Sequence, residues 1–193
     1  MKILWLLASL LPQVARLTGE PEQPFGGWLV ATLDQLLKNE ENEVFVCYRA
    51  SGVPKSGASG RLSYRSFEQE TLSFSPENEA LFTALLYAER PDVVHIWGTE
   101  YPSTLAMLNA LERLGWLDRA VVSIQGLTSV YARHYEAGLP GRVVHGATLR
   151  DLLRQDNIAA QKQKFEQRGL FEIEALKKAR HVIGRTQWDR DCS

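Results

Sequence analysis

MKILWLLA, residues 1–8, is the stretch that decides how this sequence is interpreted. One lysine is followed by a short apolar run, which suits either a secretory signal peptide or the first buried strand of a fold. A signal peptide would be cleaved after Ala15, but Gln13 occupies the position two residues earlier, where a small residue is needed. The sequence that follows favours the strand, so we expect residues 3–8 to form a retained central strand, with the signal peptide as the alternative.

The next forty residues continue a parallel α/β pattern. FGGW, residues 25–28, precedes a helical pattern over residues 28–39, where Leu29, Leu33 and Leu36 share one face. EVFVCYRA, residues 43–50, is a continuous apolar run of the kind that forms a buried parallel strand. Strand, glycine turn, helix and strand in this order predict the start of a parallel sheet.

The same alternation runs to the end of the chain. It predicts helices that begin at Pro76, Pro102 and residue 128, strands over residues 93–97, 121–125 and 181–186, and a helical segment over residues 148–179 that breaks near Gly169. Beyond that break, a stripe of Leu170, Ile173, Leu176 and Ala179 is expected. Residues 50–60 are predicted to be a loop without packing, and residues 61–70 a weak edge strand.

The predicted fold class is therefore α/β, doubly wound, with a mainly parallel, Rossmann-like sheet of five to seven strands. Residues 1–193 are expected to form one domain. Because the sequence stops in the first turn of a new helix, we also expect it to be one lobe of a larger protein.

Composition narrows the classes of partner. There are 22 Lys and Arg against 23 Asp and Glu, so nothing indicates nucleic acid as a partner. Cys47 and Cys192 are far apart and fit no metal spacing, and two cysteines fit a reducing, cytoplasmic compartment. We expect no metal and no cofactor. Residues 128–168 hold seven basic against four acidic residues, which suits an anionic acceptor, a peripheral contact with the inner face of a membrane, or a solvated face.

Candidate ligand-binding residues follow from one rule: parallel sheets bind ligands beyond the carboxyl ends of their strands. That rule selects the residues that follow the predicted strands: Gly26 and Gly27, then Gly98, Thr99 and Glu100, then Gly126, Leu127 and Thr128, and finally Thr186 and Gln187. A glycine pair before a helix lets a ligand approach the backbone, and the helix start attracts an anion. The pair is equally explained by a tight turn, and it completes neither a dinucleotide fingerprint nor a P-loop.

Three aromatic or titratable groups add to this set. His95 lies within the predicted strand over residues 93–97, with Trp97 on the same face. His95 is either a hydrogen-bonded core residue or a weak candidate for catalysis, and Trp97 either packs or stacks on a sugar-like ligand. Tyr131 and His134 share a helix face that is either ligand-binding or solvated.

Several stretches together resemble the N-terminal lobe of family 4 glycosyltransferases, which have the two-lobed GT-B architecture. They are MKILWL, FGGWLVATLDQL, PDVVHIWGTEYPSTLAMLNA, VVSIQGLTSVYARHY and ALKKARHVIGRTQWDRD, in the order of the family. The resemblance implies hexosyl-type transfer from a nucleotide-sugar donor to a saccharide or lipid-linked acceptor, without a metal, in cell-surface polysaccharide or glycolipid synthesis. It implies that this lobe binds mainly the acceptor, and that a C-terminal lobe absent from this chain holds the donor through paired glutamates.

By that resemblance, the chain alone would be inactive, and its cleft would be lined by Gly26, Gly27, His95, Trp97, Gly98, Thr99, Gln125, Gly126, Arg185 and Thr186. Gln125 departs from the family, where many members have a histidine, and glutamine cannot exchange protons. The catalytic residue is therefore unassigned. Two alternatives remain. One is a non-catalytic α/β module that binds a glycan or a protein. The other is a Rossmann-like enzyme such as an epimerase, but the incomplete glycine fingerprint argues against it.

Overall fold

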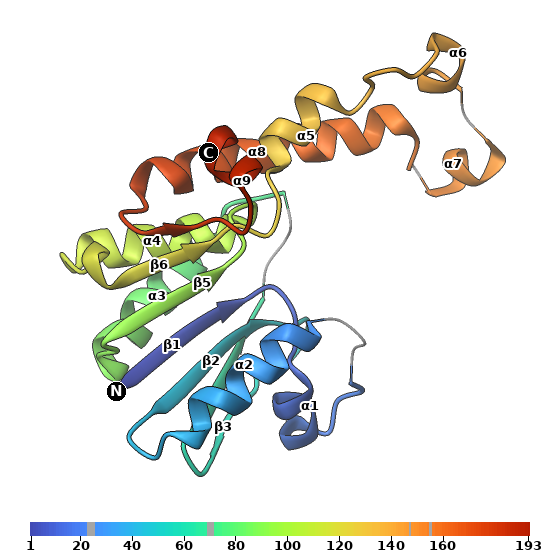
Figure 1. The fold of residues 1–193 in the computed structure, drawn as a ribbon. Helices are drawn as coiled ribbons and strands as arrows, with labels where there is room; N and C mark the ends of the chain where they lie inside the picture. Colours follow the sequence, from blue (N-terminus) through green and yellow to red (C-terminus); the bar gives the residue numbers. More distant parts are fainter. Residues whose placement is uncertain (23–25, 69–71, 147, 155) are drawn as a thin grey trace.

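The computed structural model describes residues 1–22, 26–68, 72–146, 148–154 and 156–193. Within these ranges, one seven-stranded sheet has the order β3-β4-β2-β1-β5-β6-β7 (Figure 1). The strands are β1 (Lys2–Leu7), β2 (Glu43–Arg49), β3 (Ser56–Ser59), β4 (Leu62–Phe67), β5 (Val93–Trp97), β6 (Ala120–Ser123) and β7 (Val182–Ile183). Every neighbouring pair is parallel except β3 and β4. The predicted α/β fold with a mainly parallel, Rossmann-like sheet is confirmed.

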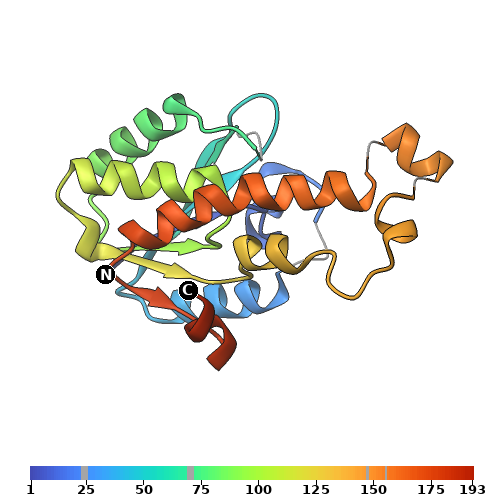
Figure 2. The same cartoon turned by 90° about the horizontal axis from the view of Figure 1, so that it is seen from above.

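Helices cover both faces of the sheet. α1 (Pro12–Thr18) and α2 (Gly27–Lys38) lie on one face, and α3 (Pro76–Glu89), α4 (Pro102–Arg113) and the long α8 (Ile158–Lys178) lie on the other (Figure 2). The shorter segments are the 3-10 turn Leu117–Arg119, α5 (Thr128–His134), α6 (Gly141–Val144), α7 (Leu149–Arg154) and α9 (Gln187–Cys192). The domain is thus doubly wound around one sheet.

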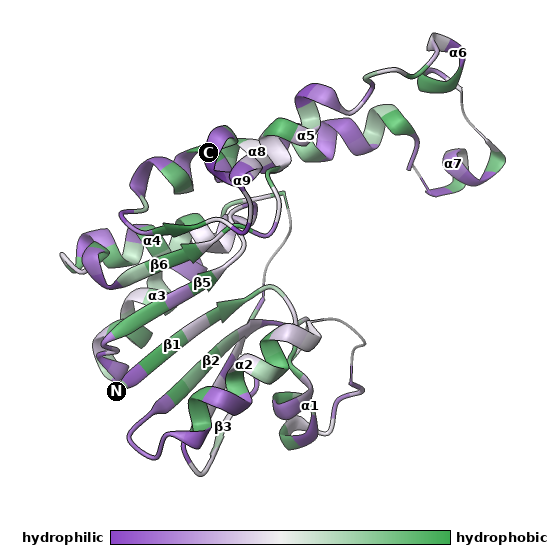
Figure 3. Cartoon of the chain, viewed as in Figure 1, coloured by the Kyte–Doolittle hydropathy of each residue, from purple (hydrophilic) through white to green (hydrophobic). Residues whose placement is uncertain are grey.

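The opening stretch forms the centre of this sheet, as predicted. β1 pairs with β2 on one side and β5 on the other, and residues 3–7 are all buried. Leu4 and Leu6 point into the core beneath α3 and α4, whereas Trp5 points into the core beneath α1 and α2. Alternate side chains of a strand face opposite sides, so a strand covered on both faces is apolar throughout. The hydropathy colouring is green over most of β1 and β2 (Figure 3).

The strand order reverses between β1 and β5. After β1 the chain builds the sheet through β2 to β4, and it then returns to add β5, β6 and β7 on the other side. The carboxyl ends of β1, β5 and β6 open at the same edge because these strands are parallel. Such a reversal is where open α/β sheets bind ligands.

Two segments between the predicted elements contain regular structure. The prediction for residues 50–60 is wrong, because Ser56–Ser59 forms β3, antiparallel to β4. All four of its residues are exposed, so it forms through backbone pairing without an apolar pattern. β4 is therefore not the edge strand, and residues 69 and 70 of that prediction lie outside the described ranges. The segment after β1 also contains a helix, α1, which begins at Pro12 and ends at Gly19 in a left-handed conformation.

The predicted break near Gly169 is also wrong. α8 runs without interruption through Gly169, where a Cβ would lie 2.8 Å from the Cα of Ser129 in α5. The glycine lets two helices approach closely. The buried face of α8 consists of Gly169, Glu172 and Ala175, whereas Leu170 is 66% exposed. The expected strand over residues 121–125 ends at Ser123, and the helix from residue 128 ends at His134.

Candidate functional site at the carboxyl edge of the sheet

The N-terminus of α2 lies at this edge and has no side-chain cap among the described residues. Gly26 is the residue before the helix, in a left-handed conformation with φ 79°. Gly27 begins the helix and is exposed, and a Cβ on it would meet nothing within 4 Å. The predicted glycine pair thus leaves space beside the first N–H groups of a twelve-residue helix. Phe25, which completes the predicted turn, lies outside the described residues.

An aromatic cluster joins α2 to β5 and β1. The ring of Trp97 contacts that of Trp28 at a centroid distance of 4.9 Å and that of Trp5 at 5.3 Å, both edge to face. Trp97 is only 8% exposed, whereas Trp28 is 47% exposed. The predicted ligand-stacking residue therefore lies behind Trp28, and Trp28 presents the aromatic surface to solvent.

His95 is held between β5 and β6. Its Nε2 lies 2.8 Å from the Oγ of Ser123, and its ring stacks on Trp97 at 3.6 Å. Burial lowers the pKa of His95 to about 4, because charging an imidazole away from water is unfavourable. The side chain is neutral at physiological pH and can form a hydrogen bond, but it carries no proton for release to a substrate near pH 7.

The turn after β5 depends on Gly98. This residue has φ 103°, a conformation that side chains disfavour. Its N–H donates to the carbonyl of Ser123 at 2.9 Å, and its carbonyl accepts from the Oγ1 of Thr104 at 2.8 Å. A Cβ here would lie 3.0 Å from the Oε2 of Glu100. The glycine thus leaves room for the Glu100 carboxylate, which folds back towards the turn.

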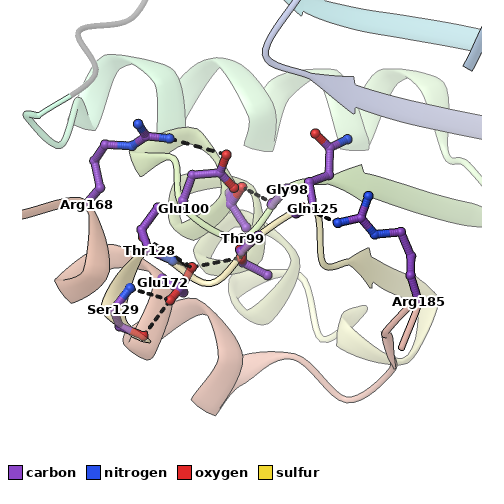
Figure 4. Close-up of polar contacts among 11 residues, drawn as sticks. Gly98, Thr99, Glu100, Gln125, Thr128, Ser129, Arg168, Glu172 and Arg185 are labelled. Atoms are coloured by element: carbon purple, nitrogen blue, oxygen red, sulfur yellow. Dashed lines mark hydrogen bonds and ion pairs between the residues drawn. The ribbon is translucent and has the colours of Figure 1, made fainter. Parts of the chain in front are cut away.

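Glu100 is a buried carboxylate that pairs with α8. Its Oε1 lies 3.3 Å from the Nη2 of Arg168 (Figure 4). The guanidinium of Arg168 also lies over the ring of Tyr101. The Oε2 of Glu100 has no hydrogen-bond partner within the described part of the chain. Burial raises the pKa of Glu100, although the charge of Arg168 opposes this effect. Glu100 is therefore the carboxyl group at this edge with spare hydrogen-bonding capacity.

The carboxylate of Glu172, in α8, caps the N-terminus of α5. Its carboxylate accepts from the backbone N–H groups of Thr128 and Ser129, both at 2.9 Å, and from both of their hydroxyls. The Oγ1 of Thr99 donates to it at 3.1 Å and lies 3.3 Å from the carbonyl of Gly126 (Figure 4). Thr99 is thus engaged in the protein's own network, and the N-terminus of α5 is occupied by a protein carboxylate.

The residues after β6 and β7 meet across the edge. The guanidinium of Arg185 donates to the carbonyl of Gln125 (Figure 4). A Cβ on Gly126 would lie 3.1 Å from the ring of Tyr131, so a side chain at that position would require the ring to shift. Thr186 caps α9, since its Oγ1 accepts from the backbone N–H of Asp189 at 3.2 Å.

The structure therefore brings most of the predicted residues to one edge. Contacts link Trp28 to Trp97, Gly98 to Ser123, Thr99 to Gly126, and Arg185 to Gln125. Thr186 and Thr99 are occupied by protein contacts, whereas Gly27 and Trp28 are exposed. A helix start that no described side chain caps, beside an exposed indole, suits a ligand with both an anionic group and an apolar ring face.

Sequence reasoning missed Trp28, Arg168 and Glu172 as parts of this edge. Trp28 directly follows the glycine pair, which was a usable signal. Arg168 lies 68 positions from its partner Glu100, and Glu172 lies 73 positions from its partner Thr99. In the sequence, both look like solvent-exposed charged residues of a helix. Only tertiary packing places them here.

Comparison with protein-family models gives no match, and no curated protein matches the chain significantly. Within the described residues, no helix is both long and apolar enough to cross a membrane. The same residues include no group of three or more His, Cys, Asp or Glu side chains placed to hold a metal ion. The class that the fold defines is thus a Rossmann-like α/β protein with a polar and aromatic carboxyl edge.

Proposed function

We propose that the chain is the N-terminal, acceptor-side lobe of a glycosyltransferase with the GT-B architecture. The parent enzyme would transfer a hexosyl group from a nucleotide sugar to a saccharide or lipid-linked acceptor, at the cytoplasmic face of a membrane. The observation that carries this proposal is the pairing of the α2 N-terminus, at Gly26 and Gly27, with the exposed ring of Trp28 at the strand-order reversal. No side chain of the described residues caps that N-terminus.

Each part of that pairing has a chemical role in sugar transfer. The first N–H groups of α2 would stabilise the negative charge that develops on the leaving diphosphate. The indole of Trp28 would pack on the apolar face of a sugar ring. In this proposal the donor nucleotide binds mainly to a second lobe outside these residues.

The test is a transfer assay on the whole protein that contains this chain. UDP-glucose, UDP-galactose, UDP-N-acetylglucosamine and GDP-mannose are each supplied with saccharide and lipid-linked acceptors, and released nucleotide and glycosylated product are both measured. Transfer or slow hydrolysis of one donor would support the proposal. Failure to turn over any nucleotide sugar, together with tight binding of NAD in calorimetry, would contradict it and favour an epimerase-like enzyme.

A second candidate is a module that binds a glycan or a protein without catalysis. The neutral His95, tied to Ser123, and the non-titrating Gln125 favour it, because neither is a protonated acid that could donate to a leaving group near pH 7. Binding of an oligosaccharide that is lost when Trp28 is replaced, without turnover of any nucleotide sugar, would support this second candidate.

A further inference from the structure

A segment between α5 and α8 stands away from the sheet. We name it the arm and define it as residues 139–154, of which residue 147 is not described. It contains α6 and α7, and both views place it beyond the end of α8, on the side away from the strands (Figures 1 and 2). The arm therefore presents its side chains to whatever surrounds the domain.

The arm exposes large apolar side chains. Leu149 is 76% exposed and Leu153 is 79% exposed, and their spacing of four residues places them on one face of α7. Leu139 and Val143 are 41% and 43% exposed. Single exposed leucines are common, but four large apolar residues on one projecting segment indicate a surface that binds a partner.

Basic residues flank this apolar face. Arg142, Arg150 and Arg154 stand against one acid, Asp151, which gives the arm a net charge of 3 − 1 = +2. The carboxylate of Asp151 is engaged locally, because it accepts from the backbone N–H of Thr148 at 2.9 Å. An apolar face beside a cationic face is the pattern of helices that lie in a membrane interface.

We propose that the arm docks on an anionic lipid bilayer, with Leu149 and Leu153 at the boundary of the acyl chains and the arginines at the headgroup phosphates. A second copy of the chain is a less suitable occupant, because a symmetric contact would bring two positively charged arms together. The inference rests on the membrane location in the proposed function and names the segment that makes the contact. Docking on a bilayer needs no donor or acceptor, so vesicle binding and sugar transfer can each fail without the other.

Sedimentation with lipid vesicles tests this directly on the 193-residue chain. Vesicles of phosphatidylcholine alone are compared with vesicles containing one third phosphatidylglycerol, at low and high salt. We expect binding only to the anionic vesicles, weakened by salt. Replacing Arg150→Gln and Arg154→Gln together should lower the partition coefficient about 30-fold. Replacing Leu149→Ser and Leu153→Ser together should lower it at least about tenfold.

Matched controls separate the arm from general surface effects. Val53→Ser with Tyr87→Ser removes two other exposed apolar residues, and Arg65→Gln with Arg90→Gln removes two other exposed arginines. Both control pairs should bind vesicles like the unchanged protein, and circular dichroism melting should show every variant folded. Equal loss of binding in the control pairs, no binding of the unchanged chain, or a dimer that depends on Leu149 and Leu153 would each overturn the proposal.

Discussion

The carboxylate of Glu172, in α8, accepts a hydrogen bond from the backbone N–H of Thr128, the first residue of α5, at 2.9 Å. Glu172 is completely buried and accepts four further hydrogen bonds, which join α5, α8 and the turn after β5. A buried carboxylate is tolerated only when such bonds replace its hydration. These hydrogen bonds therefore hold α5 and the turn after β5 against α8.

Replacing Glu172→Gln should destabilise the fold by about 2–4 kcal/mol, because one amide nitrogen would face donors that now bind an oxygen. Urea unfolding followed by circular dichroism measures the change. Glu174→Gln is the matched control, since Glu174 is exposed two positions away and should cost about 0.5 kcal/mol or less. Equal midpoints for the two variants would contradict the buried role of Glu172.

Gly169→Ala should also destabilise the protein, by about 1–3 kcal/mol, because the new Cβ would lie 2.8 Å from the Cα of Ser129. This sign is the reverse of the usual effect of alanine in a helix. Gly141→Ala provides the control, because a Cβ at that position meets nothing within 4 Å. Thermal melting of both variants measures the change in stability. If both variants were more stable than the unchanged protein, α5 and α8 would not approach each other as closely as described.

Much of the sheet could be predicted because its central strands are buried on both faces. β1 and β2 are apolar runs for this reason, and the glycines and prolines between them mark the turns. β3 could not be predicted, since its four exposed residues carry no apolar pattern. Gly169 was misinterpreted because a glycine within a helical pattern looks like a break until the neighbouring helix is known.

The site was predictable only where strand ends determine it. Gly26, Gly98 and Gly126 were selected because they follow parallel strands, and the structure places all three at one edge. The charged partners from α8 were not predictable, because the packing of α8 against α4 and α5 decides which of its faces is buried.

Stability should fall as the pH is lowered from 6.5 towards 4, with a contribution from His95. Its pKa is lowered from an ordinary 6.5 to about 4 in the folded protein. Between these values the unfolded chain binds the proton and the folded chain does not, so protonation favours unfolding. The contribution is about 2 kcal/mol at most once the partial exposure of His95 is considered.

Urea midpoints measured from pH 7.5 to 4.5 isolate that contribution. His95→Gln should flatten the dependence relative to the unchanged protein, while other titrating groups affect both proteins equally. His134→Gln, on the exposed side of α5, controls for the substitution itself and should leave the urea midpoint at pH 7.5 unchanged. Identical curves for His95→Gln and the unchanged protein would show that the His95 pKa is not lowered by folding.

Gly27→Val should reduce sugar transfer by the whole protein at least about tenfold, because the side chain would occupy the space beside the first N–H groups of α2. The fold should persist, since a Cβ at this position meets no atom within 4 Å. Steady-state kinetics and a melting curve on the same preparation check both statements. A variant with full activity would mean that the glycine pair serves only the turn.

Hydrogen–deuterium exchange of the whole protein tests the central claim most directly. It compares the free protein with the protein saturated by the nucleotide sugar and acceptor that the transfer assay identifies, or by the oligosaccharide if only binding is found. We predict slower exchange together in peptides that cover residues 26–30, 97–101 and 125–128, and unchanged exchange in β3. Protection confined to other segments, with these three peptides unaffected, would contradict the claim that the carboxyl edge of the sheet binds the ligand.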